Sequence, residues 1–228
     1  MSSYAELHCL SNFTFLRGAS HPAELVHQAY ALGYRALALT DECSISGVVR
    51  AHVAARELGL QLIIGSEFTL NNGDKFVLLV ANKNGYRQLT RLITLARRRA
   101  PKGEYHLTID DLRAKSLSDC LSLVVCDPSP TPMERKHAKF QAISDHGKRF
   151  KSLMPNRVWL TLEQPGYGTD ECHQRSLEAL SENLEIPIVA TGNVHMHCRA
   201  RRPLHDTVSA VRHQKGRLNS KHRLAVHA

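Results

Sequence analysis

The stretch that decides the fold covers residues 35–70 and reads RALALTDECSISGVVRAHVAARELGLQLIIGSEFTL. Residues 35–41 form a short apolar run of the kind found in buried strands. Residues 46–60 carry apolar side chains at helical spacing, and residues 61–70 are a second strand-like run. A strand, a helix and a strand in this order form one unit of a parallel sheet that is covered by helices.

The same alternation continues along nearly the whole chain, in about seven units. This number favours a closed or nearly closed barrel over an open, doubly wound sheet. No glycine-rich phosphate loop follows the first predicted strand, which weakens a nucleotide-binding interpretation. We expect further strands at residues 4–10, 75–82, 120–126, 156–164 and 186–195, and further helices at residues 20–32, 85–99, 107–115, 133–153, 169–184 and 202–213.

Length and composition limit the class of protein. With 228 residues, 43% of them hydrophobic, the chain fits one large α/β domain. We therefore expect a single domain over residues 1–228, with a disordered tail from about residue 214. No apolar run reaches the roughly 18–20 residues of a membrane span, and no export signal is visible. Six cysteines without tight paired spacing indicate free thiols, so we expect a cytoplasmic protein without a membrane partner.

The charge of the chain is strongly basic. The formal net charge is +9 and the sequence pI is about 9.5. Most of the excess lies in the second half, in runs such as ERKHAKF at residues 134–140 and CRARRP at 198–203. This balance favours contact with a polyanion, and DNA is the partner that we expect. A well-solvated basic surface without a partner remains the alternative.

Side chains that bind divalent cations fall at the ends of nearly every predicted strand. In parallel barrels, these ends and the loops that follow them build the active face. The pattern therefore predicts a convergent cation site. The strand-end residues are His8, Asp41, Glu42, Glu67, Cys126, Glu163, His195 and His197, and His106 lies in a loop.

Each of these residues also has a purely structural explanation. His8 fits a hydrogen-bonded loop residue, and Asp41 fits the cap of the helix that follows it. Cys126 fits a small apolar core residue, and His106 fits a surface residue. Glu67 is harder to explain in this way, because an unpaired carboxylate at the end of an apolar strand is costly to bury.

Five separated stretches together resemble the PHP (polymerase and histidinol phosphatase) domain, and more closely the N-terminal domain of error-prone C-family bacterial DNA polymerases. The resemblance implies a distorted seven-stranded β/α barrel. In its metal-competent members, histidines and carboxylates hold up to three divalent ions that activate water for phosphoester hydrolysis; in other members the domain is structural. The stretches are AELHCLSNFTFLRGAS (5–20), ALALTDECSISGVVRAH (36–52), GSEFTL (65–70), NKNGYRQLTRLITLA (82–96) and VATGNVHMHCRARRPLHDTVSAV (189–211).

The family's ligand pattern is only partly kept. Its opening His-x-His motif becomes His8-Cys9-Leu10, and the next ligand position falls near Leu16 and Arg17. Its closing Asp-x-His motif becomes Asn193-Val194-His195, which keeps the imidazole and loses the carboxylate. The resemblance thus marks Leu10, Arg17 and Asn193 as lost-ligand positions, and His8, Asp41, Glu42, Glu67, His106, Cys126 and His195 as the remaining candidate metal ligands.

These departures predict a degraded site. A cluster of cations needs several anionic ligands, and the loss of one ligand or its supporting partner commonly costs 10–100-fold in affinity or activity. We expect no metal or one weakly bound divalent cation, Zn²⁺ or Mn²⁺, with little or no hydrolysis. We also expect the guanidinium of Arg17 to pair with Glu42 or Glu67 in place of the ion.

Three functions follow from these observations. The first is a PHP domain or fragment of an error-prone DNA polymerase that acts in replication and damage-tolerant repair synthesis, bracing other polymerase domains or subunits near DNA. The longer parent would be the nucleotidyltransferase, and whether this chain itself is an enzyme stays open. The second is a stand-alone metal-dependent phosphoesterase or exonuclease that uses His8, Glu67 and His195 as ligands, with Glu42 as a further candidate. The third is a basic module that binds polyanions without chemistry.

Overall fold

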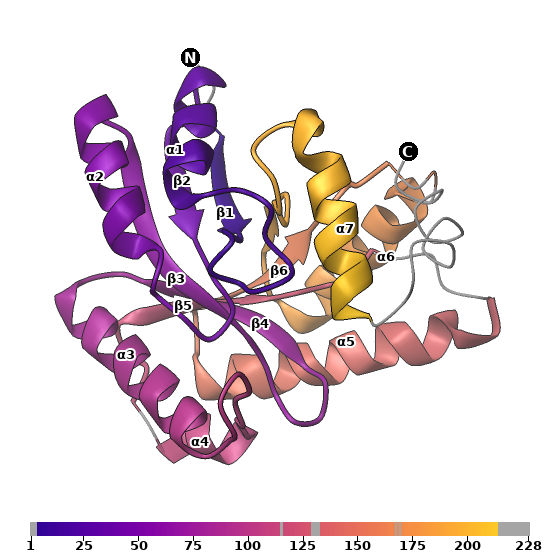
Figure 1. Cartoon of the computed structure of the whole chain (residues 1–228). Helices are drawn as coiled ribbons and strands as arrows, with labels where there is room; N and C mark the ends of the chain where they lie inside the picture. Colours follow the sequence, from indigo (N-terminus) through magenta and orange to yellow (C-terminus); the bar gives the residue numbers. More distant parts are fainter. Residues whose placement is uncertain (1–3, 115, 129–132, 167, 169, 214–228) are drawn as a thin grey trace. The chain divides into compact units, whose positions relative to one another are not determined.

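The computed structural model describes residues 4–114, 116–128, 133–166, 168 and 170–213, and the tail expected from about residue 214 lies outside them. Strands and helices alternate along this part of the chain (Figure 1). The strands are β1 (Ala5–Cys9), β2 (Ala36–Leu39), β3 (Gln61–Thr69), β4 (Lys75–Val80), β5 (Cys120–Val124), β6 (Val158–Leu162) and β7 (Ile188–Ala190). The helices are α1 (Pro22–Ala31), α2 (Val48–Leu58), α3 (Lys83–Arg98), α4 (Ile109–Ala114), α5 (Met133–Leu153), α6 (Asp170–Leu184), the short 3₁₀ helix η1 (Arg199–Arg201) and α7 (Arg202–Arg212).

The seven strands follow one another in sequence order, from β1 to β7. β1, β2 and β3 are parallel, and so are β5, β6 and β7. β4 runs antiparallel to β5, because a tight turn reverses the chain after β3. In this turn Leu70 N donates to Asp74 O at 2.8 Å, and Gly73 takes the left-handed φ of 92° that glycine adopts without strain. The predicted seven-stranded α/β fold is confirmed.

The chain divides into two compact units, residues 1–66 with 192–228 and residues 67–191. The single domain expected over the whole chain stays a prediction. Among the residues that the structure describes, no helix has both the length and the apolar content that a bilayer span requires.

The first unit is built around β1, β2, α1 and α2. α1 and α2 contact each other (Figure 1) and bury apolar side chains such as Leu25, Val26 and Ala51. The segment that follows β7 returns to β1: Val194 N donates to His8 O at 2.9 Å, and Leu10 N donates to Val194 O at 2.8 Å. This return brings the last predicted ligand motif beside the first.

The second unit packs α3 and α5 against its strands. Phe76 of β4 stacks on Phe68 and contacts Phe150 of α5. α3 begins with Asn82 as N-cap, whose side chain accepts from two backbone N–H groups of the first turn and so satisfies part of the free helix end. Gly85 lets α3 approach β5, since a Cβ at this position would lie 2.1 Å from the carbonyl oxygen of Asp119.

Replacing Gly85 with alanine therefore tests the packing of α3. Helix propensity alone predicts a gain of about 1 kcal/mol, whereas the clash with the backbone of Asp119 predicts a net loss of about 1–3 kcal/mol. Urea unfolding of Gly85→Ala measures the difference. Thr94→Ala, on an exposed position of the same helix, is the control and should be neutral or slightly stabilising. A more stable Gly85→Ala protein would contradict the close approach.

Candidate functional site

Asp41 is a structural anchor in the first unit. Its buried carboxylate accepts hydrogen bonds from Ser11 N and Ser11 Oγ, both at 2.8 Å, and from Thr14 Oγ1 at 2.7 Å. Burial raises the pKa of Asp41, and the donors of Thr14 and Ser11 oppose this rise. Because both oxygens are used in this way, Asp41 fixes the loop between β1 and α1 and offers little to a cation.

The same loop carries Arg17 to Glu42. Arg17 Nη1 lies 2.6 Å from Glu42 Oε2, and the two side chains are 10% and 20% exposed. Thr14, from the same loop, also binds Glu42. Its Oγ1 accepts a hydrogen bond from the backbone N–H of Glu42 at 3.0 Å. Glu42 is one of the two partners predicted for Arg17. A guanidinium thus supplies positive charge beside a carboxylate that was predicted as a metal ligand.

Glu6 is a buried acid that the sequence analysis did not single out. It accepts from His8 N at 2.8 Å, from Tyr4 Oη at 2.9 Å and from Gly192 N at 3.0 Å. A Cβ on residue 192 would lie 2.5 Å from Glu6 Oε2, so a larger residue there would require the carboxylate of Glu6 to move. Burial raises the pKa of Glu6. Its position early in β1, away from the predicted strand end, is why the strand-end rule overlooked it.

The imidazole of His195 contacts one residue of its own segment and one residue of α7. Its Nε2 lies 3.1 Å from Asn193 Oδ1, and its Nδ1 lies 3.3 Å from His205 Nε2 on α7. His8 is fully buried in β1, and its backbone carbonyl accepts from Val194 N. The structure therefore brings the backbones of His8 and His195 onto neighbouring segments of the first unit.

The positions that the resemblance marks as lost ligands carry no imidazole, thiol or carboxylate. Leu10 is completely buried and belongs to the apolar interior. Leu16 and Asn193 have the left-handed φ values of 60° and 47°. Asparagine tolerates this conformation, but it is strained for leucine. Each of these two loops thus contains a non-glycine residue with a left-handed backbone conformation.

Three of the seven candidate ligands that the resemblance marks as remaining, Glu67, His106 and Cys126, lie in the second unit. Glu67 is buried, with Lys75 Nζ 3.9 Å from its Oε1. His106 is exposed, and its Nε2 lies 2.7 Å from the Nδ2 of Asn71 in the turn after β3. This position agrees with the surface alternative for His106.

Cys126 behaves as a core residue. Its side chain is completely buried, and its Sγ donates to Val124 O at 3.4 Å. Burial raises the pKa of this thiol to about 12. A protonated thiol is a poor metal ligand, because the thiolate is the form that binds. The alternative of a small apolar residue therefore describes Cys126 best.

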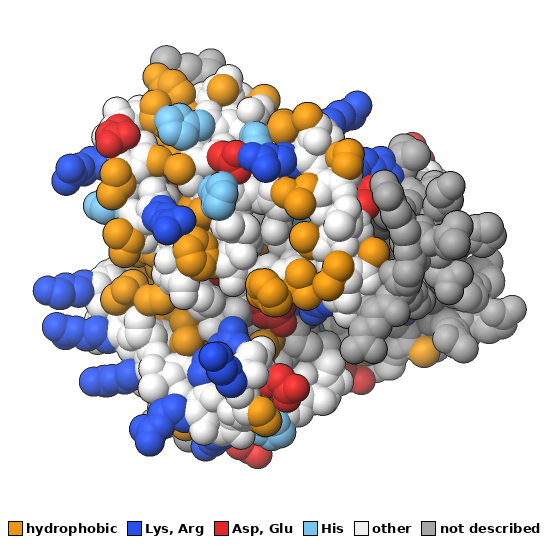
Figure 2. Space-filling model, in the orientation of Figure 1, with side chains coloured by type: hydrophobic (Ala, Val, Ile, Leu, Met, Phe, Trp, Pro, Cys, Tyr) orange, Lys and Arg blue, Asp and Glu red, His pale blue; other side chains and the backbone are white. Residues whose placement is uncertain are grey.

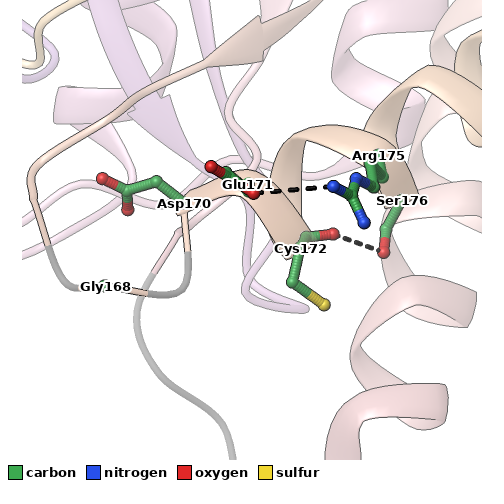
Figure 3. Close-up of a pocket in the computed structure, with 6 residues that line it drawn as sticks. All are labelled: Gly168, Asp170, Glu171, Cys172, Arg175 and Ser176. Atoms are coloured by element: carbon green, nitrogen blue, oxygen red, sulfur yellow. Dashed lines mark hydrogen bonds and ion pairs between the residues drawn. The ribbon is translucent and has the colours of Figure 1, made fainter.

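Two hollows on the described surface are lined by none of the predicted ligands. One, of about 250 Å³, lies between the loop after β1 and α7, and is lined by Phe15, Leu204 and Val208 among others. The other, of about 500 Å³, lies at the start of α6, where Glu171 pairs with Arg175 at 3.5 Å (Figure 3). Neither hollow has the enclosed, convergent polar groups typical of an active site.

The residues present do not fit a cluster of divalent cations. Among the described residues, no three or more His, Cys, Asp or Glu side chains are grouped so that they could hold a metal ion. The oxygens of Asp41 are bound to the loop, and Glu42 is paired with Arg17. We therefore derive no reaction step through a metal ion here.

The family is decided by a match over most of the chain. The profile of the PHP domain matches residues 6–164. This chain belongs to the PHP domain family. The match includes β1 to β6, and with them the first predicted ligand motifs.

The PHP domain described here is also similar to parts of much longer proteins. It is 46% identical over 225 residues to the error-prone DNA polymerase of Ralstonia nicotianae and 49% identical over 216 residues to that of Dechloromonas aromatica. Each alignment covers 93% of this chain but 20% of the relative. The chain thus spans about a fifth of the length of these curated relatives.

Solved structures support the fold of this PHP domain. A proposed metal-dependent phosphoesterase from Bifidobacterium adolescentis matches with a TM-score of 0.57 and 14% identity, over 86% of this chain and 88% of the other. An amidohydrolase from Chromobacterium violaceum, solved with bound sulfate and no metal, matches with a TM-score of 0.58 and 14% identity, over 84% and 87%. At this identity the likeness concerns the fold alone.

The anchoring role of Asp41 can be measured directly. Asp41→Ala leaves the donors of Ser11 and Thr14 without their acceptor, so we expect a loss of about 2–4 kcal/mol in the free energy of unfolding. Asp110→Ala is the control, since Asp110 is exposed and its ion pair with Arg113 is worth little. Urea unfolding of both variants checks this. Equal effects at the two positions would contradict the anchor.

The state of Cys126 can be tested by alkylation. With a pKa of about 12, about one molecule in ten thousand carries the thiolate at about pH 8, and burial also blocks access. Mass spectrometry after iodoacetamide treatment should find Cys172, which is exposed, modified and Cys126 unmodified until urea is added. Native labelling of Cys126 at the rate of Cys172 would overturn the assignment as a core residue.

Proposed function

We propose that this chain is the PHP module of a longer error-prone DNA polymerase, in which it has a structural role and does not hydrolyse phosphoesters. The observation that carries the proposal is the ion pair of Arg17 with Glu42. It provides the charge neutralisation that a divalent cation would otherwise give to this carboxylate. The occupied oxygens of Asp41 support the same conclusion.

The relatives support the placement in a polymerase. The two aligned relatives are named error-prone DNA polymerases and are about five times as long as this chain. We therefore propose that the partners are the other domains of such a polymerase and the DNA on which it acts, in the cytoplasm. The net charge of +9 supports a location close to a polyanion.

Metal binding and hydrolysis test the structural role. After incubation with Mn²⁺ or Zn²⁺ and removal of free ions, metal analysis by mass spectrometry should find fewer than one tightly bound ion per chain. Hydrolysis of p-nitrophenyl phosphate and of a labelled DNA 3′ end should not exceed that of a sample without protein. Two or three bound ions with metal-dependent hydrolysis would overturn the proposal in favour of a phosphoesterase.

Restoring the lost ligands tests why the site fails. Leu10→His with Asn193→Asp returns an imidazole and a carboxylate, and we expect metal occupancy to rise. The same pair combined with Arg17→Ala should raise it further, because the competing guanidinium is gone. Circular dichroism controls for folding, since Leu10 is buried. Unchanged occupancy in both folded variants would show that the fold, not these side chains, prevents binding.

A further inference from the structure

Helix α3 carries a stripe of cations on its outer face. Lys83, Arg87, Arg91 and Arg98 are all exposed, and their spacing of four, four and seven residues places them within an arc of about 80° at 3.6 residues per turn. Figure 2 shows the corresponding row of Lys and Arg side chains projecting over α3. From Lys83 to Arg98 the stripe is about 22 Å long, at a rise of about 1.5 Å per residue. We call these four residues the α3 stripe.

The opposite face of α3 explains why the stripe is presented outward. Gly85, Leu89, Leu92 and Ala96 are buried and lie on the far side of the helix from the stripe. Packing of this apolar face, together with the close approach at Gly85, fixes the rotation of the helix. The α3 stripe is therefore displayed by a rigid element rather than by a loop.

The stripe is not neutralised by the protein. The sequence of α3 contains no aspartate or glutamate, and between described residues no carboxylate forms an ion pair with any of its four cations. Two neighbouring arginines behave differently: Arg97 lies over the ring of Tyr105, with 5.3 Å from Cζ to the ring centroid, and Arg99 pairs with Asp111 at 2.5 Å. Like charges four residues apart destabilise a helix. The α3 stripe therefore lowers the stability of α3, and no ion pair between described residues offsets this loss.

The geometry points to the α3 stripe as a contact surface for the phosphate backbone of DNA. Along about 22 Å, one strand presents about six phosphates at an axial spacing of about 3.4 Å, so a linear row of four cations can follow a single strand. Lysine and arginine on a regular helix face contact phosphates without reading bases. The expected binding is therefore independent of sequence and strongly dependent on salt.

Two other partners fit the stripe less well. A helix that binds a membrane surface inserts an apolar face beside its basic one, but the apolar face of α3 is buried in the domain. An interface with an acidic protein would be expected to have an apolar centre and a polar rim. The α3 stripe has no apolar centre. A uniform row of phosphates is the partner with the matching chemistry.

This inference rests on the proposed function for the choice of DNA, which it deepens by assigning the face that makes contact. The two proposals can fail separately. If DNA binds elsewhere on the chain, the assignment of the α3 stripe as the contact surface is wrong, but the proposal of a polymerase module is unaffected. If metal-dependent hydrolysis is found, the proposed structural role is wrong, but the assignment of the α3 stripe as a DNA contact surface is unaffected.

A matched pair of variants tests the stripe. In the full chain, K83Q/R87Q/R91Q/R98Q removes its four charges. The control R56Q/K148Q/R175Q/R212Q removes four charges from exposed positions on α2, α5, α6 and α7. Both variants have the same net charge, and glutamine keeps helix propensity. Fluorescence anisotropy then measures binding of labelled oligothymidine, a duplex and oligouridine, each of about 20 nucleotides and so longer than the stripe, between about 50 and 200 mM KCl.

We expect the stripe variant to lose at least about tenfold in affinity for DNA at about 50 mM salt, and its slope of log affinity against log salt to fall by about three to four. The control should lose less than about threefold and keep the slope of the wild type. Equal losses in both variants would overturn the proposal, since only net charge would then matter. Absence of salt-dependent binding by the wild type, or binding of oligouridine alone, would also overturn it. Circular dichroism confirms that each variant is folded.

Discussion

The geometry of the candidate site depends on one buried carboxylate. Asp41 accepts three hydrogen bonds from Ser11 and Thr14, and these bonds set the course of the loop between β1 and α1. The loop in turn brings Arg17 to Glu42. Burying a carboxylate is costly unless it is fully hydrogen-bonded. The donors of the loop therefore stabilise the buried Asp41, and Asp41 in turn orders the loop. A residue predicted as a metal ligand thus serves to place a guanidinium.

The Arg17–Glu42 pair places a guanidinium, and not a divalent cation, as the positive charge beside Glu42 after the end of β2. A divalent cation polarises or activates bound water, whereas a guanidinium is a fixed charge whose hydrogen bonds are directional. The pair is partly buried, so breaking it would leave a poorly solvated charge. The pair therefore connects the loop between β1 and α1 to the residue that follows Asp41. Glu6, which binds Gly192 N, has a similar role where the chain returns to β1.

Much of the fold could be predicted from the sequence, because its signals are local and repeated. Apolar runs such as residues 36–39 and 61–69 end at turn or cap residues, and each became a strand. The site was harder, because a sequence shows which residues end strands but not what their side chains meet. The pairing of Arg17 with Glu42 or Glu67 was predicted from the family resemblance, which places Arg17 at a lost-ligand position, together with the opposite charges of these side chains. The bonds of Asp41 to Ser11 and Thr14 were not, since they depend on a loop that includes the left-handed Leu16, a conformation that leucine rarely adopts.

A double-mutant cycle on Arg17 and Glu42 tests the central claim most directly. Unfolding free energies of Arg17→Met, Glu42→Gln and the double variant give the coupling energy between the two side chains. The same cycle on Arg113 and Asp110, an exposed pair at 2.9 Å, provides the reference, with an expected coupling below about 0.5 kcal/mol. If Arg17 supplies the charge that Glu42 needs, its coupling is about 1–3 kcal/mol. Additive effects at Arg17 and Glu42, equal to those of the exposed pair, would contradict the account.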